Sequence, residues 1–397
     1  MQPLVISHCT LANSLGLGLS ETLDALRSRR SGLIPCAFED VDLETYIGKV
    51  GAVDDCLIRS DLSFYDCRNN RLAQLSLEQE GFVSAIQAAK KKYTPGRIGV
   101  FLGTSTSGIL QTELAYRHLD SVTGALPPDF HYAETQNSYS LANFVAHYLG
   151  LNGPSFVVSS ACSSSAKVFA NAARMMAAGM CDAAVVGGVD SLCLSTLYGF
   201  NSLGLVSRFP CRPYDAERDG ISVGEGAGFV LLERATAASS PDAMLLLGVG
   251  ESSDAYHMST PHPEGLGAKL AMQRALDAAG LRAKDIDYIN LHGTATKSND
   301  TSEGKAVADV FGTSVPCSST KGWTGHQLGA AGITEAIISM LAVEHDFVPG
   351  SLNTQHLDPS ITINYQIENS EGRINRVLSN SFGFGGSNCS LILGRQS

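Results

Sequence analysis

The segment spanning residues 156–189 constrains the fold most strongly, because it predicts two buried strands joined by one helix. Residues 156–158 (Phe-Val-Val) are apolar and largely β-branched, as in a buried strand. Residues 162–180 contain strong helix formers and no proline or glycine before Gly179. Residues 182–189 return to an apolar strand pattern. Apolar strands on either side of a helix indicate a parallel α/β sheet that helices cover on both faces.

A single cysteine, Cys162, stands at the junction of this strand and helix. On the first turn of a helix, unpaired N–H groups and the positive end of the helix dipole favour the thiolate form of cysteine. The small residues Ser160, Ala161 and Ser163 leave room for a carbonyl group to approach the sulfur. Cys162 is therefore a candidate nucleophile. The alternative is a buried structural cysteine, which is the commoner role of this residue type.

The second half of the chain repeats the strand–helix pattern. Its predicted elements are a strand at residues 287–291, a helix at 301–310, a strand at 315–319, a helix at 332–345 and two closing strands at 377–381 and 388–393. A length of 397 residues suits one large or two medium domains. A low-complexity patch at residues 235–240 is the predicted boundary, and it gives two similar halves, 1–237 and 238–397.

Charge and hydropathy exclude several classes of protein. The net charge of −11 argues against a general nucleic-acid binder. No uninterrupted apolar stretch approaches the ~18 residues that span a bilayer, and the amino terminus lacks the basic region and apolar core of a signal peptide. The ten cysteines are scattered without a Cys-x-x-Cys pair, which suits reduced thiols. We therefore predict a cytoplasmic protein with no membrane span.

Two of the ten histidines, His292 and His326, end an apolar strand or follow one by a few residues. Ligands of open α/β sheets bind beyond the carboxyl ends of the strands, where Cys162 is also expected. The three residues together predict a covalent acyl-transfer site. One cysteine and two histidines are also a legal zinc ligand set. Their positions in the sequence match no metal motif, so we predict no metal.

A glycine cluster at residues 224–228 (Gly-Glu-Gly-Ala-Gly) superficially resembles a dinucleotide-binding fingerprint. That fingerprint follows a strand and opens a helix. Here the cluster precedes a predicted strand at residues 229–232. We therefore exclude a nucleotide site of this type.

Five motifs occur in order along the chain: Ser-Ala-Cys-Ser-Ser-Ser at residues 160–165, Arg-Pro-Tyr-Asp and Arg-Asp-Gly at 212–215 and 218–220, His-Gly-Thr-Ala-Thr at 292–296, Lys-Gly-Trp-Thr-Gly-His-Gln-Leu-Gly-Ala-Ala-Gly at 321–332, and Asn-Ser-Phe-Gly-Phe-Gly-Gly-Ser-Asn at 380–388. With these motifs the chain resembles, over essentially its whole length, the β-ketoacyl-acyl-carrier-protein synthases of type II fatty acid and polyketide synthesis. The resemblance implies a thiolase-like α/β fold with two similar halves in a layered α-β-α-β-α arrangement, usually as a dimer.

The resemblance also implies an acyltransferase that joins malonyl-carrier protein to a cysteine-bound acyl chain by decarboxylative Claisen condensation. Cys162 would carry the acyl group, and its N–H with that of Phe384 would form the oxyanion hole. His292 and His326 would donate hydrogen bonds to the enolate. Phe384 would also act as a gate between flexible glycines.

Further roles follow from the same resemblance. Lys321 and Glu335 would orient the site and balance its charge, the alternative being a simple buried ion pair. Thr294 and Thr296 would bind the pantetheine amides. The substrates would arrive on the phosphopantetheine arm of an acyl carrier protein, so no separate cofactor is expected.

The chain departs from the family's usual pattern at two places. After Thr296 the family usually has Pro, a small residue, Gly and Asp, whereas this chain has Lys-Ser-Asn and then Asp300. We assign Asp300 to substrate binding, and we expect Asn299 to keep the positive φ of glycine. Thr106 occupies a position that limits the depth of the acyl pocket, where a bulky aliphatic residue is common. Together these departures predict a specialised synthase from a secondary-metabolite or polyene pathway.

The predicted partner is an acidic acyl carrier protein, which an acidic chain can bind only through a local basic patch. Arg68 and Arg71, on a helix predicted to run to residue 89, and Arg208 are the candidates; the alternative is that they are ordinary solvated arginines. The dimer would contain two copies of this chain or one copy and a related synthase-like subunit.

Two alternative functions remain open at this point. One is a non-catalytic, chain-length-determining partner subunit, but such subunits usually lack the cysteine found at position 162. The other is a thiolase, which needs a second catalytic cysteine near the carboxyl terminus. Cys389 is the only candidate there, and it lies within a predicted strand.

Overall fold

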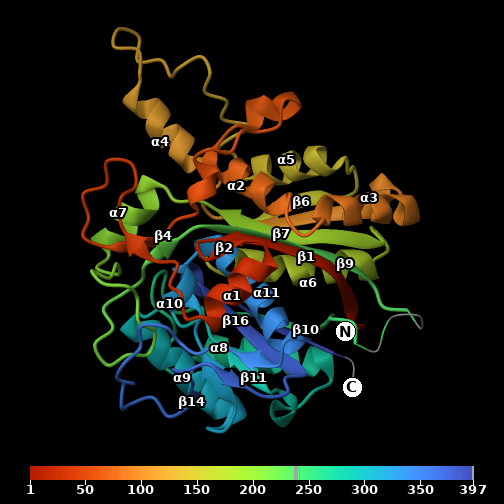
Figure 1. Cartoon of the computed structure of the whole chain (residues 1–397), viewed down its shortest axis with the longest axis vertical. Helices are drawn as coiled ribbons and strands as arrows, with labels where there is room; N and C mark the ends of the chain where they lie inside the picture. The colour runs from red at the N-terminus through yellow and green to blue at the C-terminus, as the bar shows by residue number, and fades with distance from the viewer. Residues whose placement is uncertain (237–239, 241, 396–397) are drawn as a thin grey trace.

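The computed structural model describes residues 1–236, 240 and 242–395 (Figure 1). Its strands are β1 (Leu4–Asn13), β2 (Gly16–Leu17), β3 (Ile34–Pro35), β4 (Tyr46–Gly48), β5 (Ile98–Gly103), β6 (Ser155–Val158), β7 (Ala183–Asp190), β8 (Val223–Gly224), β9 (Gly226–Arg234), β10 (Leu245–Ser253), β11 (Tyr288–Asn290), β12 (Pro316–Ser318), β13 (Phe347–Val348), β14 (Asn364–Tyr365), β15 (Ser370–Glu371), β16 (Arg376–Gly383) and β17 (Ser387–Gly394). Its α-helices are α1 (Leu19–Arg27), α2 (Arg68–Leu77), α3 (Phe82–Tyr93), α4 (Ile109–Arg117), α5 (Tyr139–Leu149), α6 (Ser164–Ala177), α7 (Leu194–Ser202), α8 (Leu266–Ala279), α9 (Lys297–Phe311), α10 (Lys321–Thr324) and α11 (Ala331–Glu344).

Most strands belong to one continuous 12-stranded sheet. Eleven of them have the order β14-β12-β11-β16-β17-β10-β1-β9-β7-β5-β6, and the twelfth, β2, pairs with the end of β1. The sheet contains the same arrangement of five strands twice, once as β6-β5-β7-β9-β1 and once as β12-β11-β16-β17-β10. In each, three parallel strands are followed by an antiparallel neighbour. The two sets join where β1 pairs with β10, with Leu4 opposite Leu246. Two similar α/β halves are therefore confirmed.

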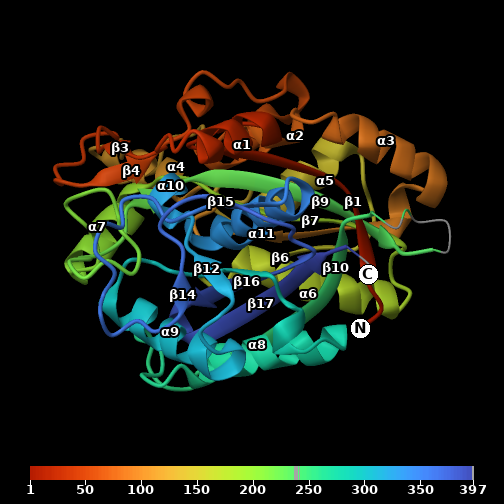
Figure 2. The same ribbon diagram turned by 60° about the horizontal axis from the view of Figure 1, so that its bottom comes forward.

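The helices and the folded sheet form five layers, which Figure 2 shows from the side. Helices α6 and α11 lie between the two parts of the sheet, and their apolar side chains pack against strands of both. Helices α2, α3 and α5 cover one outer face, and α8 and α9 cover the other. Residues 331–343 of α11 are all buried, as expected for a helix that is apolar on every side.

Three predicted helix boundaries differ from the structure. Helix α6 begins at Ser164, two residues after Cys162. The helix predicted to reach residue 89 is divided into α2 and α3, because Glu80 and Gly81 adopt left-handed φ angles of 54° and 63°. Helix α9 begins at Lys297, because Thr296 caps it by accepting a hydrogen bond from the Asn299 N–H.

The predicted boundary between residues 237 and 238 lies outside the described residues. No described helix is long and apolar enough to cross a membrane.

A buried ion pair attaches α2 to the small sheet β3-β4-β8. Arg68 Nε and Nη2 donate to the Glu225 carboxylate at 2.8 and 2.6 Å, and Arg68 Nη1 donates to Asp54 at 2.5 Å. Glu225 is fully buried, and it also accepts hydrogen bonds from the N–H groups of Val50 and Leu192. This carboxylate thus joins four segments that are distant in the sequence.

Replacing Arg68 by methionine leaves the Glu225 charge buried without its cation, which typically costs ~3–5 kcal/mol. We therefore expect Arg68→Met to lower the free energy of unfolding by this amount in urea titrations. The control is Arg71→Met, because Arg71 pairs with the partly exposed Asp66 and such pairs contribute ~0–1 kcal/mol. Equal stability of the two variants would contradict the assignment.

Candidate active site

Cys162 lies in a tight turn between β6 and α6. Ala161, before it, has a left-handed φ of 51°. The Ser164 hydroxyl accepts from the Ser160 N–H at 2.9 Å and donates to the Ala161 carbonyl at 2.6 Å, which closes the turn. The turn fixes a cysteine of which only 5% is exposed. Cys162 was predicted to lie in the first turn of the helix. In the structure it lies two residues before the helix begins.

The structure brings Cys162, His292 and His326 together from three separate loops. The Nε2 atom of His326 lies 3.0 Å from the Cys162 sulfur. The His292 ring is nearly perpendicular to the His326 ring, at 82°, with 5.3 Å between the ring centroids. The arrangement places two imidazoles on the same side of one thiol.

A buried ion pair supports His292. Lys321 Nζ donates to the Glu335 carboxylate and to the His292 carbonyl, and it lies 3.3 Å from His292 Nδ1. Glu335 is in α11, and burial raises the pKa of its carboxyl to about 7. An ammonium that donates to Nδ1 leaves the imidazole proton on Nε2, which faces the site.

The three ligand atoms of Cys162, His292 and His326 lie within 4.8 Å of one another, so their spacing alone would allow a metal ion. The charge of the surroundings argues against one. The Lys321 ammonium lies 3.3 Å from the second nitrogen of His292 and would repel a divalent cation bound to that ring. Hydrogen bonding between thiol and imidazole accounts for the contact without a metal.

Burial dominates the ionisation of the site. It raises the pKa of the Cys162 thiol to about 12, against smaller lowering effects of Lys321 and of the Phe384 N–H. Burial and Lys321 together hold the pKa values of His292 and His326 well below the usual range. The resting site therefore contains a neutral thiol and neutral imidazoles. The predicted helix-stabilised thiolate is wrong, because desolvation outweighs the favourable charges.

The sulfur opens into a pocket bounded by apolar, hydroxyl and glycine residues. Its lining comprises Cys162, Phe200, Leu205, Ile221, Asp254, Ser259, Thr260, Pro261, His292, Thr294, Thr296, Ser298, Asn299, His326, Phe382, Gly383, Phe384, Gly385, Gly386 and Asn388. The N–H of Phe384 hydrogen-bonds the Cys162 sulfur. The Phe384 ring is half-buried against Phe200, with 5.7 Å between centroids. The following Gly385 and Gly386 have φ angles of 81° and 73°, which favour glycine.

Thr294 and Thr296, predicted to bind substrate, both line this pocket. Their hydroxyl oxygens are 2.9 Å apart. Ser298 and Asn299 lie beside them, whereas Lys297 is exposed at the start of α9. Asn299 has no positive φ because it lies within the helix, so that expectation is wrong.

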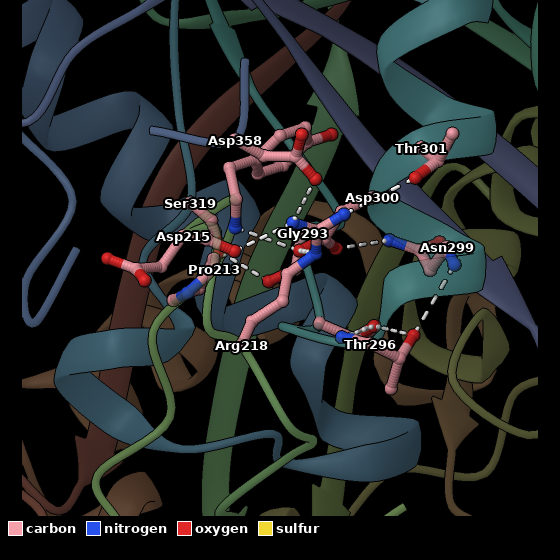
Figure 3. Close-up of polar contacts among 12 residues, drawn as sticks. Pro213, Asp215, Arg218, Gly293, Thr296, Asn299, Asp300, Thr301, Ser319 and Asp358 are labelled. Carbon is pink, nitrogen blue, oxygen red and sulfur yellow. Dashed lines mark hydrogen bonds and ion pairs between the residues drawn. The ribbon is translucent and has the colours of Figure 1, made fainter. Parts of the chain in front are cut away.

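Asp300 lies behind the pocket wall and not in the pocket, so its assignment to substrate binding is wrong. It is fully buried, accepts from the Tyr214 N–H at 2.8 Å, and lies 3.3 Å from Arg218 Nε. Arg218 also donates to Asp358 at 2.7 Å (Figure 3). Burial raises the Asp300 pKa to about 6. Asp300 and Arg218 therefore join the start of α9 to residues 214–215 and to Asp358.

Thr106 is also outside the lining of the pocket around Cys162. It is 1% exposed, and its hydroxyl donates to Asp190 at 2.8 Å and accepts from the Ser191 N–H at 3.2 Å. These hydrogen bonds of the Thr106 hydroxyl connect the loop after β5 to the end of β7. Its influence on acyl-chain length stays a prediction.

The three arginines predicted to bind a carrier protein have different surroundings. Arg68 is 9% exposed and paired with Glu225 and Asp54, so the structure contradicts its role in docking. Arg71 is partly exposed and paired with Asp66. Arg208 is exposed and has no ion-pair partner within the described part of the chain. Only Arg208 presents a free charge.

Two buried carboxylates were missed by the sequence analysis. Glu303 accepts from the N–H groups of His292 and Gly293, both at 2.8 Å. Asp190 accepts hydrogen bonds from residues 104–106 and, at 2.5 Å, from the Gly329 N–H. An acid that ends a fully apolar strand, as Asp190 does, was the one available signal.

Comparison with known proteins gives the family of the chain. Residues 70–238 match the N-terminal domain of beta-ketoacyl synthases, and residues 244–355 match the C-terminal domain. The chain belongs to the β-ketoacyl synthase family. It is 44% identical to 3-oxoacyl-[acyl-carrier-protein] synthase 2 of Rhizobium meliloti strain 1021 over 62% of each chain. It is 32% identical to 3-oxoacyl-[acyl-carrier-protein] synthase 1 of Escherichia coli strain K12 over 99% of each.

A solved structure is similar throughout. It is a chain from the complex of a ketosynthase with its chain length factor from Xenorhabdus doucetiae. The TM-score is 0.89 at 36% identity, and the match covers 100% of this chain and 98% of the other. The resemblance to condensing enzymes and the thiolase-like fold are thus confirmed, and the synthase is an acyltransferase of the ketosynthase type.

The raised thiol pKa predicts the pH dependence of alkylation. Because the Cys162 pKa is about 12, the thiolate fraction should still grow tenfold per pH unit between pH 7 and 10. The rate of iodoacetamide addition, followed by intact mass with Cys162→Ala as background, should rise without levelling. An ordinary cysteine levels near its pKa of ~8.5. A plateau between pH 6 and 8 would instead show a thiolate–imidazolium pair and contradict the neutral site.

Proposed function

We propose that Cys162 carries the acyl chain in a decarboxylative condensation with malonyl-carrier protein. The observation that carries this proposal is the 3.0 Å contact between its sulfur and His326 Nε2, with the second imidazole, His292, beside it in one pocket. A nucleophile, a base within hydrogen-bond reach and a second donor are the requirements of acyl transfer through a thioester.

Acyl transfer starts from the neutral pair. The Cys162 thiol gives its proton to His326 Nε2 while the sulfur attacks the carbonyl carbon of the incoming thioester. The N–H groups of Phe384 and Cys162 stabilise the oxyanion; loss of one such donor typically lowers the rate ~10²–10³-fold. The carbon–sulfur bond to pantetheine then breaks, and the departing thiolate takes the proton from His326.

Condensation stabilises a second anion with a different set of donors, the two imidazoles. Loss of CO₂ from the malonyl thioester leaves its electron pair as an enolate, whose oxygen accepts a hydrogen bond from His292 Nε2 and, after solvent exchange has moved the His326 proton from Nδ1 to Nε2, a second one from His326. Lys321, which donates to His292 Nδ1, keeps that ring's proton on Nε2 for this bond. The enolate carbon attacks the Cys162 thioester, a carbon–carbon bond forms, and the cysteine thiolate leaves and takes a proton from solvent.

The partner we propose is an acyl carrier protein that presents both substrates on phosphopantetheine. The names of the two sequence relatives support it, as do Thr294 and Thr296 in the pocket, where their hydroxyls can bond the amides of the arm. The departures at Thr106 and Lys297 support a specialised fatty acid, polyketide or polyene pathway.

We also propose a dimer, either of two identical chains or with a related synthase-like subunit. Helix α4 and the loop after it project from the body of the molecule at the top of Figure 1. This arm exposes large apolar side chains, including Tyr116 at 61%, Val122 at 90% and Tyr132 at 56%. Exposed apolar residues in such number mark a protein interface. The similar chain from Xenorhabdus doucetiae comes from a two-subunit complex.

Intact-mass analysis after mixing the protein with a panel of acyl-carrier proteins tests the function. One acyl group should add to the native chain and none to Cys162→Ala, which stays folded because alanine is smaller than cysteine and position 162 lies outside α6. Cys162→Gln should still release CO₂ from malonyl-carrier protein, since its amide imitates a thioester carbonyl. His292→Ala should accept the acyl group but lose this release. Acylation of Cys162→Ala would refute the nucleophile.

Arg208 should contribute to carrier binding through its free charge. Arg208→Glu should raise the KM for acyl-carrier protein severalfold at low salt and leave turnover of a small pantetheine thioester unchanged, because exposed charges steer association. Lys284→Glu is the control, since it makes the same charge change before β11, at the end of that strand remote from His292. Equal effects of the two variants, or an effect that persists at high salt, would place docking elsewhere.

A further inference from the structure

The glycine cluster that follows β8 has no role in nucleotide binding, yet it lies directly under the chain that carries His326. Gly48 of β4 and Gly224 of β8 are paired residues on adjacent strands. The main chain of His326 continues this small sheet: its N–H donates to the Ser222 carbonyl at 2.7 Å, and its carbonyl accepts from the Gly224 N–H at 2.9 Å. The main chain of His326 thus pairs with β8 in the manner of a neighbouring parallel strand.

The approach of these backbones excludes any side chain larger than hydrogen. A Cβ atom at Gly48 or at Gly224 would meet the Thr324 carbonyl oxygen at less than 3.0 Å, a separation that real Cβ atoms do not show. Neither glycine has a positive φ, so close approach alone requires glycine there. At Gly226, a Cβ would meet the side-chain amide of Gln327 instead of backbone.

The other end of the same segment is fixed by Asp190. Its carboxylate accepts from the Gly329 N–H, and a Cβ at Gly329 would lie 2.7 Å from that carboxylate. Between these two anchors, the ring of His326 is held only weakly by hydrogen bonds. Its Nδ1 is buried and has no hydrogen-bond partner among the described residues. Within that part of the chain, the ring therefore makes one hydrogen bond, from Nε2 to the Cys162 sulfur.

From this geometry we infer that Gly48 and Gly224 are positioning residues for His326. Because they lack a side chain, residues 324–326 can pack directly against the backbones of β4 and β8. The inference rests on the proposed role of His326 as the base for Cys162. Relief of a Cβ clash would lift the Thr324 carbonyl by roughly 1 Å, and displacements of that size typically cost ~10² in rate. The 3.0 Å contact between imidazole and thiol would then exceed hydrogen-bond length.

Iodoacetamide alkylation of Cys162 at pH 8, followed by intact mass, measures this positioning without any natural substrate. Gly224→Ala should react at least tenfold more slowly than the native chain and approach the rate of His326→Ala. The matched control is Gly51→Ala, three residues beyond Gly48, where an added Cβ meets no atom within 4 Å. It should react at the native rate. Native rates in Gly224→Ala overturn the inference.

A rescue experiment separates positioning from general loss of structure. Gly226→Ala should slow alkylation, and Gly226→Ala combined with Gln327→Ala should restore the rate of Gln327→Ala, because the clashing amide is gone. Gln327→Ala should not rescue Gly224→Ala, whose Cβ meets backbone. Melting temperatures accompany every rate. If Gly224→Ala is unfolded at the assay temperature, Gly48→Ala decides, because its Cβ meets the same Thr324 carbonyl, and a native alkylation rate there overturns the inference.

The same measurements distinguish this inference from the proposed function. If the native chain and His326→Ala react equally fast, His326 is not the base for Cys162 and the proposed function fails. If they differ and Gly224→Ala keeps the native rate, only the positioning by glycine fails.

Discussion

Close packing of α6 against the strands beneath it determines the rest of the structure. A Cβ at Gly188 of β7 would lie 2.5 Å from the Ser165 Cβ, and one at Gly103 of β5 would meet the Ser165 N–H at less than 3.0 Å. On the opposite side, a Cβ at Gly332 of α11 would lie 2.7 Å from the Ala166 nitrogen. Glycines on three elements therefore allow the start of α6 to reach the centre of the molecule. The turn that carries Cys162 is fixed there because α6, β5, β7 and α11 pack closely around it.

The electrostatics of the site follow from this depth. A nucleophile at the centre of five layers loses its solvation, so its thiol and both imidazoles remain neutral at rest. The buried charges around the site include two groups that contain a cation, Lys321 with Glu335 and Arg218 with Asp300 and Asp358, and two carboxylates that, among the described residues, accept only from N–H and O–H donors, Glu303 and Asp190. Lys321 and Glu303 hold the loop that carries His292. The active site therefore uses full charges for structure and neutral, polarisable groups for reaction.

The sequence predicted what depends on local pattern. Apolar strands, the strand-end positions of His292 and His326, and the repeated plan of the halves all follow from periodicity and from the geometry of parallel sheets. It did not predict partners that meet only in the folded chain. Arg68 was predicted to bind a carrier protein, yet it pairs with Glu225, which lies far along the sequence. Asp300 was assigned to substrate binding because it stands at the Asp of the family's pattern after Thr296, but its partner is Arg218, which belongs to another motif. The ionisation of Cys162 depends on burial, which no local pattern of residues reports.

The position of β1 at the seam of the sheet has a consequence for how the chain folds. This first strand pairs with β9 and β10, whose residues lie beyond position 225. On a ribosome, more than half of the chain emerges before either neighbour exists. Until then β1 pairs only with the two-residue strand β2, so most of its two edges and its apolar face stay unpaired, and these features promote intermolecular pairing. The contact order is correspondingly high, and completion of the sheet waits for synthesis of the second half. The segment from β9 to β10 therefore determines when the nascent chain ceases to be prone to aggregation.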